Sequence, residues 1–594
     1  MQLAADIQQV IVLGTIALLF IVLFTERFKP AVSFLFAALI LVITGILSPK
    51  DVLAGLANES IVSIVLLIII TAALRSNYDI YSVLDRFFSK TKTYRSFLLL
   101  MMGKVALLSS IVNNTPVVVL MTPYVFEWGK KNKISPSKLL IPLSYATIVG
   151  GMITIIGTST TLVLNGFLIN NGIDQISPWS LFIIGSAVAL MCLLFLGIFS
   201  GKLLPSRRDL IERFEQEKRE YLIEKRLQKN SELIGKTVRA GGLRNLKGVY
   251  LVEIVRGERI ISPVNPEEVV EANDILIFAG NTDTIVDLSL SNIGIELPEN
   301  VAPQGKNLEV VETVVSANSS IIGKSIKDSN FRERYDAAVV AIHRNGEKLS
   351  GKLGRIRLKA GDVLLLFTGD TFKNKVELYK DLYLISGGRK AFEAKNGNTI
   401  KLIVLVAATI LLLITQIYNL FVSLLIICAL MVALRMITLR NIKRDIDPNL
   451  IIILVLSLAL GRAMIKTGAG ELLASSIIDL LAPYGQVSLL FAVAIVTTIL
   501  TAFITNVGAV SIAFPLTLAL VTSTGMAGDP FYLTIAFAAS AAFISPVGYQ
   551  TNLIVYGPGG YNFKDFLKIG VPMTAIYLGT ALSVILYLYR HLFF

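Results

Sequence analysis

The sequence predicts a polytopic α-helical membrane protein with inverted repeats and re-entrant hairpins, together with two α+β cytoplasmic domains inserted in its middle. The 594-residue chain is 54% hydrophobic and only 16% charged, and its mean hydropathy is +0.69. Its apolar residues gather in runs that approach the length needed to cross a bilayer, and one long charged stretch separates two sets of such runs. This composition lies far from that of a soluble globular domain.

Seven apolar segments precede the charged stretch, within residues 1–200, and seven follow it, within 399–594. They lie near residues 8–25, 30–47, 61–74, 97–112, 115–126, 139–169 and 177–198, and then near 400–416, 418–435, 450–465, 487–504, 507–523, 531–557 and 569–589. The first segment follows an N-terminus without Lys or Arg and has no small-residue cleavage site, so we expect a retained helix. The stretch between the halves has no run of about 20 apolar residues, so we expect it to be soluble.

The distribution of basic residues predicts the orientation in the membrane. The loops at 26–30, 75–96, 127–138, 435–448 and 561–568 contain 17 Lys and Arg residues, whereas the opposite loops and ends contain four. Basic loops remain on the cytoplasmic side, so we expect the insert 201–398 to be cytoplasmic and the protein to be a multi-pass protein of the bacterial inner membrane. The same pattern accounts for the net charge of +13, and no nucleic-acid partner is expected. Cys192 and Cys428 lie in apolar runs, which gives no disulfide framework.

Two pairs of short apolar segments predict re-entrant hairpins. The first hairpin, 97–126, turns at the sequence NNTP, which begins at Asn113, and both of its flanks, at Arg95 and Lys130, are basic. Its arms are short for membrane-crossing helices, so we expect the chain to enter and return on one side. The second hairpin, 487–523, turns at TNVG, which begins at Thr505, and its flanks lie on the opposite side. The second hairpin is therefore expected to be the inverted counterpart of the first.

Each hairpin is followed by an interrupted apolar segment. The segment 139–169 is broken by Gly150-Gly151 and by GTSTT, residues 157–161, and the segment 531–557 is broken by ISPVGYQTN, residues 544–552. Small and hydroxyl residues in membrane helices often serve only close packing. Four breaks at matching positions of two halves, however, are the pattern of a secondary-transporter binding site.

The residues at the breaks indicate the cargo. Helix N-termini present N–H donors to an anion, and the hydroxyl groups that can add to them belong to Thr115, Thr158, Ser159, Ser545 and Thr551. Backbone carbonyls and Asn oxygens at the same positions are neutral ligands suited to sodium. No Asp, Glu or His lies in the breaks, which favours sodium coupling over proton coupling.

These motifs, with the run SPVGYQTNLIVYGPGGY at 545–561, resemble those of the divalent anion:sodium symporters of the SLC13 type. The resemblance covers nearly the whole membrane part and implies a homodimer in membrane lipid that works by an elevator-type movement, with 1–95 and 399–465 mainly as scaffold. Expected substrate-binding residues are Asn114, Thr115, Thr158, Ser159, Asn506, Val507, Ser545 and Pro546. Expected sodium-binding residues are Asn113, Asn114, Gly157, Thr505, Asn506, Ser545, Thr551 and Asn552.

The chain departs from that family's Ser-Asn-Thr tip signature in two places. Asn113 stands where Ser is usual, and the second tip ends in Val507, where a hydroxyl is expected. Ser545-Pro546 stands for the family's Thr-Pro. Fewer hydroxyl donors at the second tip favour a compact tetrahedral anion such as sulfate over a dicarboxylate, which has two separated carboxylates to satisfy.

The insert contains an internal repeat about 88 residues apart. IGKT at 234–237 matches IGKS at 322–325, and AND at 272–274 matches AGD at 360–362. The two copies, 225–290 and 310–376, resemble TrkA-C (RCK C-terminal) domains, which implies dimerisation and a possible regulatory nucleotide such as cyclic di-AMP; a pure assembly module is the alternative. The charged stretch at 201–224, which continues to residue 230, is expected to be a linker helix.

Two other classes of transport protein remain open. The first is an exchanger of the aspartate:alanine type, which also carries paired TrkA-C modules between two membrane halves. The second is a regulated ion channel, although the sequence contains no TVGYG-like selectivity filter. An enzyme is not expected, because the insert shows no nucleophile-base arrangement or metal-ligand spacing.

Overall fold

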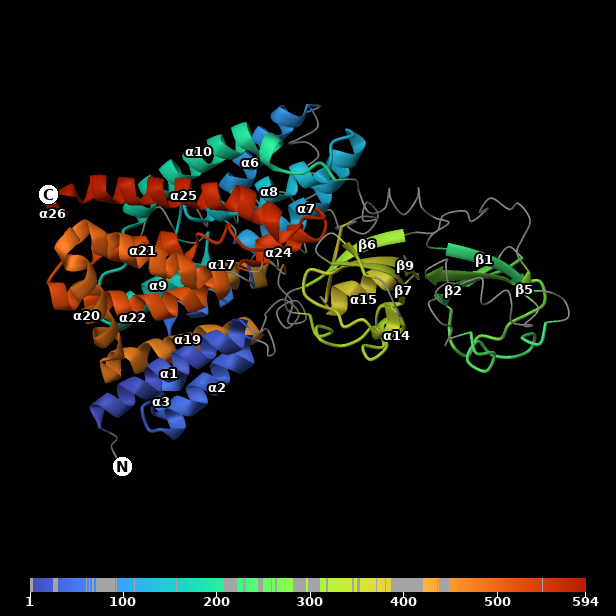
Figure 1. Cartoon of the computed structure of the whole chain (residues 1–594), viewed down its shortest axis with the longest axis horizontal. Helices are drawn as coiled ribbons and strands as arrows, with labels where there is room; N and C mark the ends of the chain where they lie inside the picture. Colours follow the sequence, from blue (N-terminus) through green and yellow to red (C-terminus); the bar gives the residue numbers. More distant parts are fainter. Residues whose placement is uncertain are drawn as a thin grey trace.

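The computed structural model shows a body of packed helices with two small β-sheet domains in a row at one end (Figure 1). It describes residues 4–24, 30–70, 91–207, 222–280, 295–296, 310–385, 420–436 and 448–593. Within these ranges it leaves out residues 60, 64, 67–68, 92, 112, 156, 228–230, 244–248, 258, 262–263, 317–318, 345–346, 350–352, 370, 380, 435 and 547. The expected segment at 400–416 and most of the linker helix at 201–224 and of the basic loops at 75–96 and 435–448 lie outside the described residues.

Helices from the first and second halves of the chain pack together along one side of the helical body (Figure 1). They are α1 (Ala5–Phe24), α2 (Pro30–Ile43), α3 (Pro49–Leu53), α19 (Pro448–Thr467) and α20 (Ala469–Leu481), and the second half also contains α17 (Leu420–Ala433). α19 packs against α1, α2 and α3, and the chain bends by 74° between α19 and α20. The bend lies at Gly468, whose positive φ of 70° favours glycine. α3 begins with a capping box, in which the Ser48 N–H donates to Asp51 Oδ2 at 2.8 Å.

The remaining helices follow the same order in both halves. The first half contains α6 (Tyr94–Ser109), α7 (Asn114–Lys131), α8 (Leu140–Gly151), α9 (Ser159–Asn170) and α10 (Pro178–Leu203), with a 3₁₀ turn at Pro136–Lys138. The second contains α21 (Gln486–Phe503), α22 (Asn506–Thr524), α23 (Asp529–Ala539), α24 (Gln550–Tyr556), α25 (Phe563–Leu588) and α26 (Arg590–Phe593), with a 3₁₀ turn at Ala482–Tyr484. α6 packs on α8 as α21 packs on α23. Contacts between the halves also correspond, because α9 packs on α22, α24 packs on α7, and α10 packs on α25.

By length and composition, four of the described helices can cross a membrane. They are α1, α10, α22 and α25, and the bent pair α19–α20 makes a fifth if it counts as one span. α22 is the second arm of the hairpin expected at 487–523, and with 19 residues it is longer than the expected segment 507–523. α6, the first arm of the hairpin expected at 97–126, has only 16 residues.

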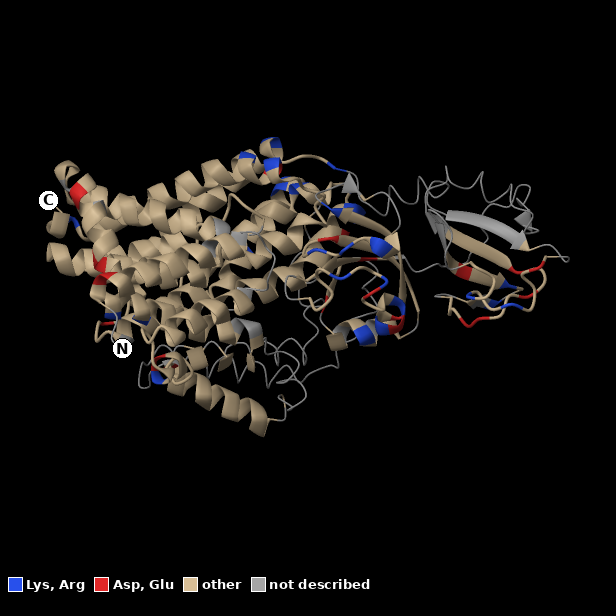
Figure 2. Cartoon of the chain, turned by 60° about the horizontal axis from the view of Figure 1, so that its bottom comes forward, with Lys and Arg blue, Asp and Glu red and all other residues tan. Residues whose placement is uncertain are grey.

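Basic residues gather at the end of the helical body that faces the sheet domains (Figure 2). Lys130 and Lys131 lie in the last turn of α7, and Lys202 lies in the last turn of α10. The opposite end carries few charges (Figure 2). The asymmetry that the loop sequences predict therefore extends across the folded molecule.

The insert folds into two five-stranded antiparallel sheets with the same strand order. The first contains β1 (Leu222–Leu227), β2 (Val249–Arg256), β3 (Arg259–Ile261), β4 (Ile275–Gly280) and β5 (Ile295–Glu296), in the order β3-β2-β4-β1-β5. The second contains β6 (Val310–Val315), β7 (Ala337–Arg344), β8 (Glu347–Lys348), β9 (Val363–Thr368) and β10 (Leu382–Leu384), in the corresponding order β8-β7-β9-β6-β10, with α14 (Phe331–Tyr335), a 3₁₀ turn at Leu353–Arg355 and α15 (Phe372–Tyr379). Both sheets extend beyond the expected ranges of 225–290 and 310–376. The linker helix expected at 201–224 and on to residue 230 is wrong at its end, because residues 222–227 form the strand β1 and pair with β4.

Matching ion pairs stabilise the two sheets. Arg256 donates through Nε and Nη2 to the two carboxylate oxygens of Asp274, both at 2.9 Å. Arg344, 88 residues later, makes the same two bonds to Asp362, at 2.7 and 2.8 Å. Hydrogen bonding to these carboxylates raises the pKa of both guanidinium groups. The repeated sequence thus specifies a repeated bidentate contact.

The two sheet domains pack against each other through an apolar cluster. This cluster contains Val252 and Ile277 from the first domain and Ala338, Val340, Ala341, Leu365 and Phe367 from the second. Arg332 of α14 adds hydrogen bonds across the same boundary, to the carbonyl oxygens of Leu251 at 2.7 Å and Val264 at 3.0 Å. The second domain also contacts the helical body, because Val314, Val363 and Ile385 belong to the large buried cluster of the helices.

Candidate functional site

The first hairpin tip lies between α6 and α7, where the sequence NNTP places it. α7 begins at Asn114, with Asn113 as its N-cap. The Asn114 side chain is 1% exposed, and its Oδ1 accepts a hydrogen bond of 2.5 Å from Ser109 Oγ, near the end of α6. Asn113 and Thr115 are half-buried. The end of one arm therefore fixes the orientation of the amide at the start of the other.

The second tip repeats this arrangement. α22 begins at Asn506, and Thr505 caps it by accepting the Gly508 N–H at 3.2 Å. Thr501, near the end of α21, donates to Asn506 Oδ1 at 2.9 Å. Thr501 precedes Asn506 by five residues, as Ser109 precedes Asn114. Val507 is buried, and Thr505 is exposed.

The first broken segment approaches the first tip closely. α8 ends at Gly151 and α9 begins at Ser159, with Thr158 as N-cap. A Cβ atom at Gly157 would lie 2.4 Å from the carbonyl oxygen of Gly151 and 2.7 Å from that of Ser109. Only glycine fits this position, which brings the break against the end of α6. Thr158 is buried and Ser159 is half-buried.

The second broken segment runs from the end of α23 at Ala539 to the start of α24 at Gln550, with Tyr549 as N-cap. Asn552 is 0% exposed and binds the preceding turn, because its Nδ2 donates to the carbonyl oxygens of Ala542 at 2.6 Å and Ser545 at 3.1 Å. Its Oδ1 accepts from Ser144 of α8 at 2.7 Å. The structure thus gives Asn552 a bracing position between the two halves.

Two further expected residues of this segment differ in their surroundings. Thr551 is 0% exposed, and its hydroxyl has no hydrogen-bond partner within the described part of the chain. Ser545 and Pro546 lie in the turn before α24, four and three residues ahead of its N-cap. The position that corresponds to the N-cap Thr158 of α9 is therefore held by Tyr549.

The structure joins the first tip to both breaks. Asn114 Nδ2 donates to the Tyr549 hydroxyl at 2.8 Å, and the side chain of Thr158 lies beside the same hydroxyl. Thr115 Oγ1 donates to Gln550 Oε1 at 3.4 Å. The N-terminal ends of α7, α9 and α24 consequently meet at Tyr549.

The second tip adjoins the same break from another side. A Cβ atom at Gly548 would lie 3.1 Å from the Thr501 carbonyl oxygen, so the end of α21 lies against the residue before Tyr549. Among the described residues, no hydrogen bond joins Asn114 to Asn506. The two tips are thus brought together through the Gly548-Tyr549 segment.

Some of the contacting residues are not among the expected substrate- and sodium-binding residues. Ser109, Ser144, Thr501, Tyr549 and Gln550 all contact an expected residue. A signal for Ser109 and Thr501 exists in the sequence, since each hairpin has a hydroxyl residue five positions before its tip asparagine. The partners of Tyr549, Gln550 and Ser144 lie more than 400 residues away along the chain, and no local pattern reveals such contacts.

The site is chemically neutral. Its side chains are amides, hydroxyls and one phenol, and four helices, α7, α9, α22 and α24, begin around it. N–H groups at helix N-termini stabilise an anion, and neutral oxygens can bind sodium. Across the described residues, no group of three His, Cys, Asp or Glu side chains could hold a metal ion.

Comparisons with known proteins show similarity to transporters. The family model described as citrate transporter matches residues 20–416 and 409–594. The chain is similar to a putative sulfur deprivation response regulator of Chlamydomonas reinhardtii, with 33% identity over 90% of this chain and 94% of that protein. An uncharacterized transporter of Synechocystis is 30% identical over 98% of this chain and 97% of its own length. Sodium/sulfate cotransporter 1 of Chlamydomonas reinhardtii is 28% identical over 61% of this chain and 43% of its own length.

Proposed function

Because this chain belongs to the citrate transporter family, we propose that it is a secondary active transporter that couples sodium to the uptake of a small divalent anion, with sulfate favoured over a dicarboxylate. As a member of this family, the chain is an integral membrane protein of an anion transporter family. One observation carries the rest of the proposal. The starts of α7, α9 and α24, from both halves, meet at a cluster of neutral polar groups around the buried Asn114 and the half-buried Tyr549.

An anion suits this cluster. A carboxylate or sulfate oxygen accepts hydrogen bonds only, and the cluster offers the Asn114 amide, the hydroxyls of Thr115 and Thr158, and the N–H groups of the first helical turns. Burial strengthens such bonds because the local dielectric constant is low. The family's anion transport supports this interpretation.

Sodium is the proposed coupling ion. The Thr551 hydroxyl is buried without a hydrogen-bond partner among the described residues, and a buried oxygen of this kind is satisfied by a cation or a water molecule. The tip asparagines supply further neutral oxygens. Relatives that are described as sodium/sulfate cotransporters support the choice of sodium.

Sulfate is favoured because the second tip presents an apolar side chain. Val507 is 5% exposed and offers no donor where a dicarboxylate would need one for its second charge. Leaving a charged oxygen without a partner in a buried site costs several kcal/mol, on the order of the desolvation of one ion. A compact anion such as sulfate has no second, separated carboxylate and avoids this cost.

The mechanism we propose is the elevator-type movement of a homodimer in the membrane. The two hairpins would enter from opposite faces, with the insert on the cytoplasmic side, where the basic ends of α7 and α10 lie (Figure 2). The contacts between corresponding helices of the two halves support this inverted arrangement.

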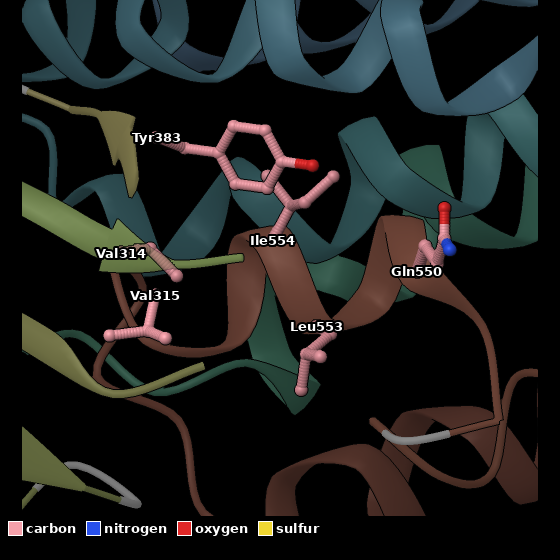
Figure 3. A pocket seen from close by; sticks show the side chains of 6 residues that line it. All are labelled: Val314, Val315, Tyr383, Gln550, Leu553 and Ile554. Carbon is pink, nitrogen blue, oxygen red and sulfur yellow. The ribbon is translucent and has the colours of Figure 1, made fainter. Parts of the chain in front are cut away.

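We also propose that the insert regulates transport. The second sheet domain packs on α24, whose N-terminal end carries Tyr549 and Gln550. Residues of both sides line a small pocket at this contact, namely Val314, Val315, Tyr383, Gln550, Leu553 and Ile554 (Figure 3). A Cβ atom at Gly557 would lie 2.4 Å from Val363 Cγ2, so the domain lies directly against the end of this helix. The nucleotide that the TrkA-C resemblance implies stays a prediction.

Uptake of radiolabelled sulfate into proteoliposomes tests the proposal. We expect an inward sodium gradient to drive accumulation and an equal potassium gradient not to. Excess unlabelled succinate, citrate or aspartate should compete weakly. Uptake that follows a proton gradient without sodium would contradict the proposed coupling.

The same vesicles distinguish the proposed symporter from an exchanger of the aspartate:alanine type. Vesicles preloaded with aspartate or alanine would then take up labelled substrate in the absence of sodium. Strong counterflow together with sodium independence would replace the proposed symport by exchange.

A further inference from the structure

The N-cap of α24 is an aromatic residue, whereas the corresponding N-cap of α9 is Thr158. Tyr549 is half-buried, and its ring packs against the large apolar cluster of the helical body. The ring is therefore held in place, and it fills space beside Asn114 that a threonine at the same position would leave open.

The hydrogen bond from Asn114 leaves the Tyr549 hydroxyl able to donate its own hydrogen. Asn114 Nδ2 can only donate, so in the bond of 2.8 Å the Tyr549 oxygen is the acceptor. The orientation of Asn114 is set from its other side, where Ser109 donates to Oδ1. The single hydrogen of the phenol is therefore not used by Asn114. Thr158, the N-cap of α9, lies beside the same hydroxyl.

An anion is a stronger acceptor than a threonine hydroxyl, because hydrogen bonds to ionised groups are roughly twice as strong as neutral ones. An anion that reaches the ends of α7, α9 and α24 would accept the hydrogen of the Tyr549 hydroxyl in preference to a neutral neighbour such as Thr158. The Asn114 amide then supports the phenol oxygen from behind.

Resting on the proposed function, we infer that Tyr549 determines the specificity of this site. Its hydroxyl donates to a compact divalent oxyanion such as sulfate, and its ring excludes the longer body of a dicarboxylate. Two features of one side chain would then set both the affinity for the anion and its maximum size.

Two variants separate these features. Tyr549→Phe keeps the ring and removes the donor, so we expect the KM for sulfate to rise about tenfold, the loss expected for one hydrogen bond to a charged group. The sodium concentration for half-maximal uptake should stay as in the wild type. Tyr549→Thr removes the ring, so succinate should inhibit sulfate uptake and should itself be taken up. Tyr556→Phe, on the same helix, is the matched control and should behave as the wild type.

Each result has one interpretation when all variants show the wild-type size-exclusion profile. An unchanged sulfate KM in Tyr549→Phe would overturn the role of the hydroxyl, and exclusion of succinate by Tyr549→Thr would overturn the role of the ring. The wild type tests the proposed function separately. Sodium-driven sulfate uptake that excludes succinate supports the proposed function whatever the variants show, and its absence removes that function and this inference together.

Discussion

At the scale of single residues, the two tip asparagines have the same local arrangement. Each begins a helix, each is buried, and each accepts a hydrogen bond from a hydroxyl five residues earlier. A side-chain amide that is held from one side can present its other atoms to a ligand without a search among rotamers. Preorganisation of this kind reduces the entropy lost on binding.

Removal of either amide should abolish coupling. Asn114→Ala and Asn506→Ala each delete a neutral oxygen and a donor from a hairpin tip, and we expect sodium-stimulated uptake to be lost while the protein still elutes as a folded species. Uptake at fixed sulfate over a range of sodium concentrations measures the effect. Undiminished uptake in both variants would remove these residues from the site.

Removal of a hydroxyl that positions a tip asparagine should weaken transport less than removal of the asparagine amide itself. Ser109→Ala leaves the Asn114 oxygen without its donor, which costs about 1–3 kcal/mol, and we expect the half-maximal sodium concentration to rise about tenfold. Ser110→Ala is the control, because the Ser110 hydroxyl donates to the Leu107 carbonyl of its own helix end. An equal effect of both changes would indicate a general loosening of α6.

At the scale of elements, the positions of the helix breaks follow from local sequence. The expected turns at NNTP and TNVG coincide with the starts of α7 and α22. Asparagine, threonine, glycine and proline at these points compete with helical hydrogen bonding or prevent it. The start of α24 is different, since Ser545-Pro546 was the expected feature and the helix begins five residues after Ser545, at Gln550.

The hairpin topology has a direct test. If α6 and α7 enter the membrane and return, then Arg95→Cys and Lys130→Cys should react with an impermeant maleimide from the same side of the membrane. Both native cysteines are first replaced by serine, and a cysteine at Lys466 should label from the other side. Labelling of Arg95→Cys and Lys130→Cys from opposite sides would contradict a re-entrant pair.

The paired arginines of the insert give a prediction for its domains. Asp362 is buried, and its ion pair with Arg344 is the contact that compensates its charge. Arg344→Ala leaves this carboxylate unpaired at a cost of roughly 3–5 kcal/mol. We expect hydrogen exchange of β7 and β9 to accelerate strongly in the full-length protein. Arg239→Ala, which breaks an exposed pair with Glu267, should leave exchange unchanged.

At the scale of the whole molecule, the contact between the second sheet domain and α24 could not be predicted. Gly361 and Gly557 each lie where the two parts approach, and a Cβ atom at Gly361 would lie 3.0 Å from Leu553 Cδ1. These residues look like ordinary turn glycines in sequence. Their role depends on how two separately folded parts dock, which no local pattern encodes. The sequence does predict that the two sheet domains repeat, because their turn and ion-pair residues recur 88 positions apart.

A substitution at this contact tests regulation by the insert. Gly557→Ala places a methyl group 2.4 Å from Val363 Cγ2 and 2.7 Å from the Gly361 carbonyl oxygen, which costs about 1–3 kcal/mol. We expect faster hydrogen exchange in β10 and α24, and a maximal uptake rate that changes by roughly fivefold with an unaltered KM. Gly579→Ala is the control, since nothing lies within 4 Å of its added Cβ atom. Loosened docking with an unchanged rate would show that the contact is only structural.

The arrangement of the two sheet domains also orders any signal that passes through the insert. In the described residues, the buried apolar residues of the first domain pack within its own core and against the second domain, whereas only the second reaches the helices. The duplicated modules are thus connected in series (Figure 1). Along the contacts of the described residues, an event sensed by the outer copy would reach α24 through the inner copy. If the insert regulates transport as we propose, loss of the Arg332 contacts would uncouple the outer copy from the helices, while the inner copy would keep its own contact with them.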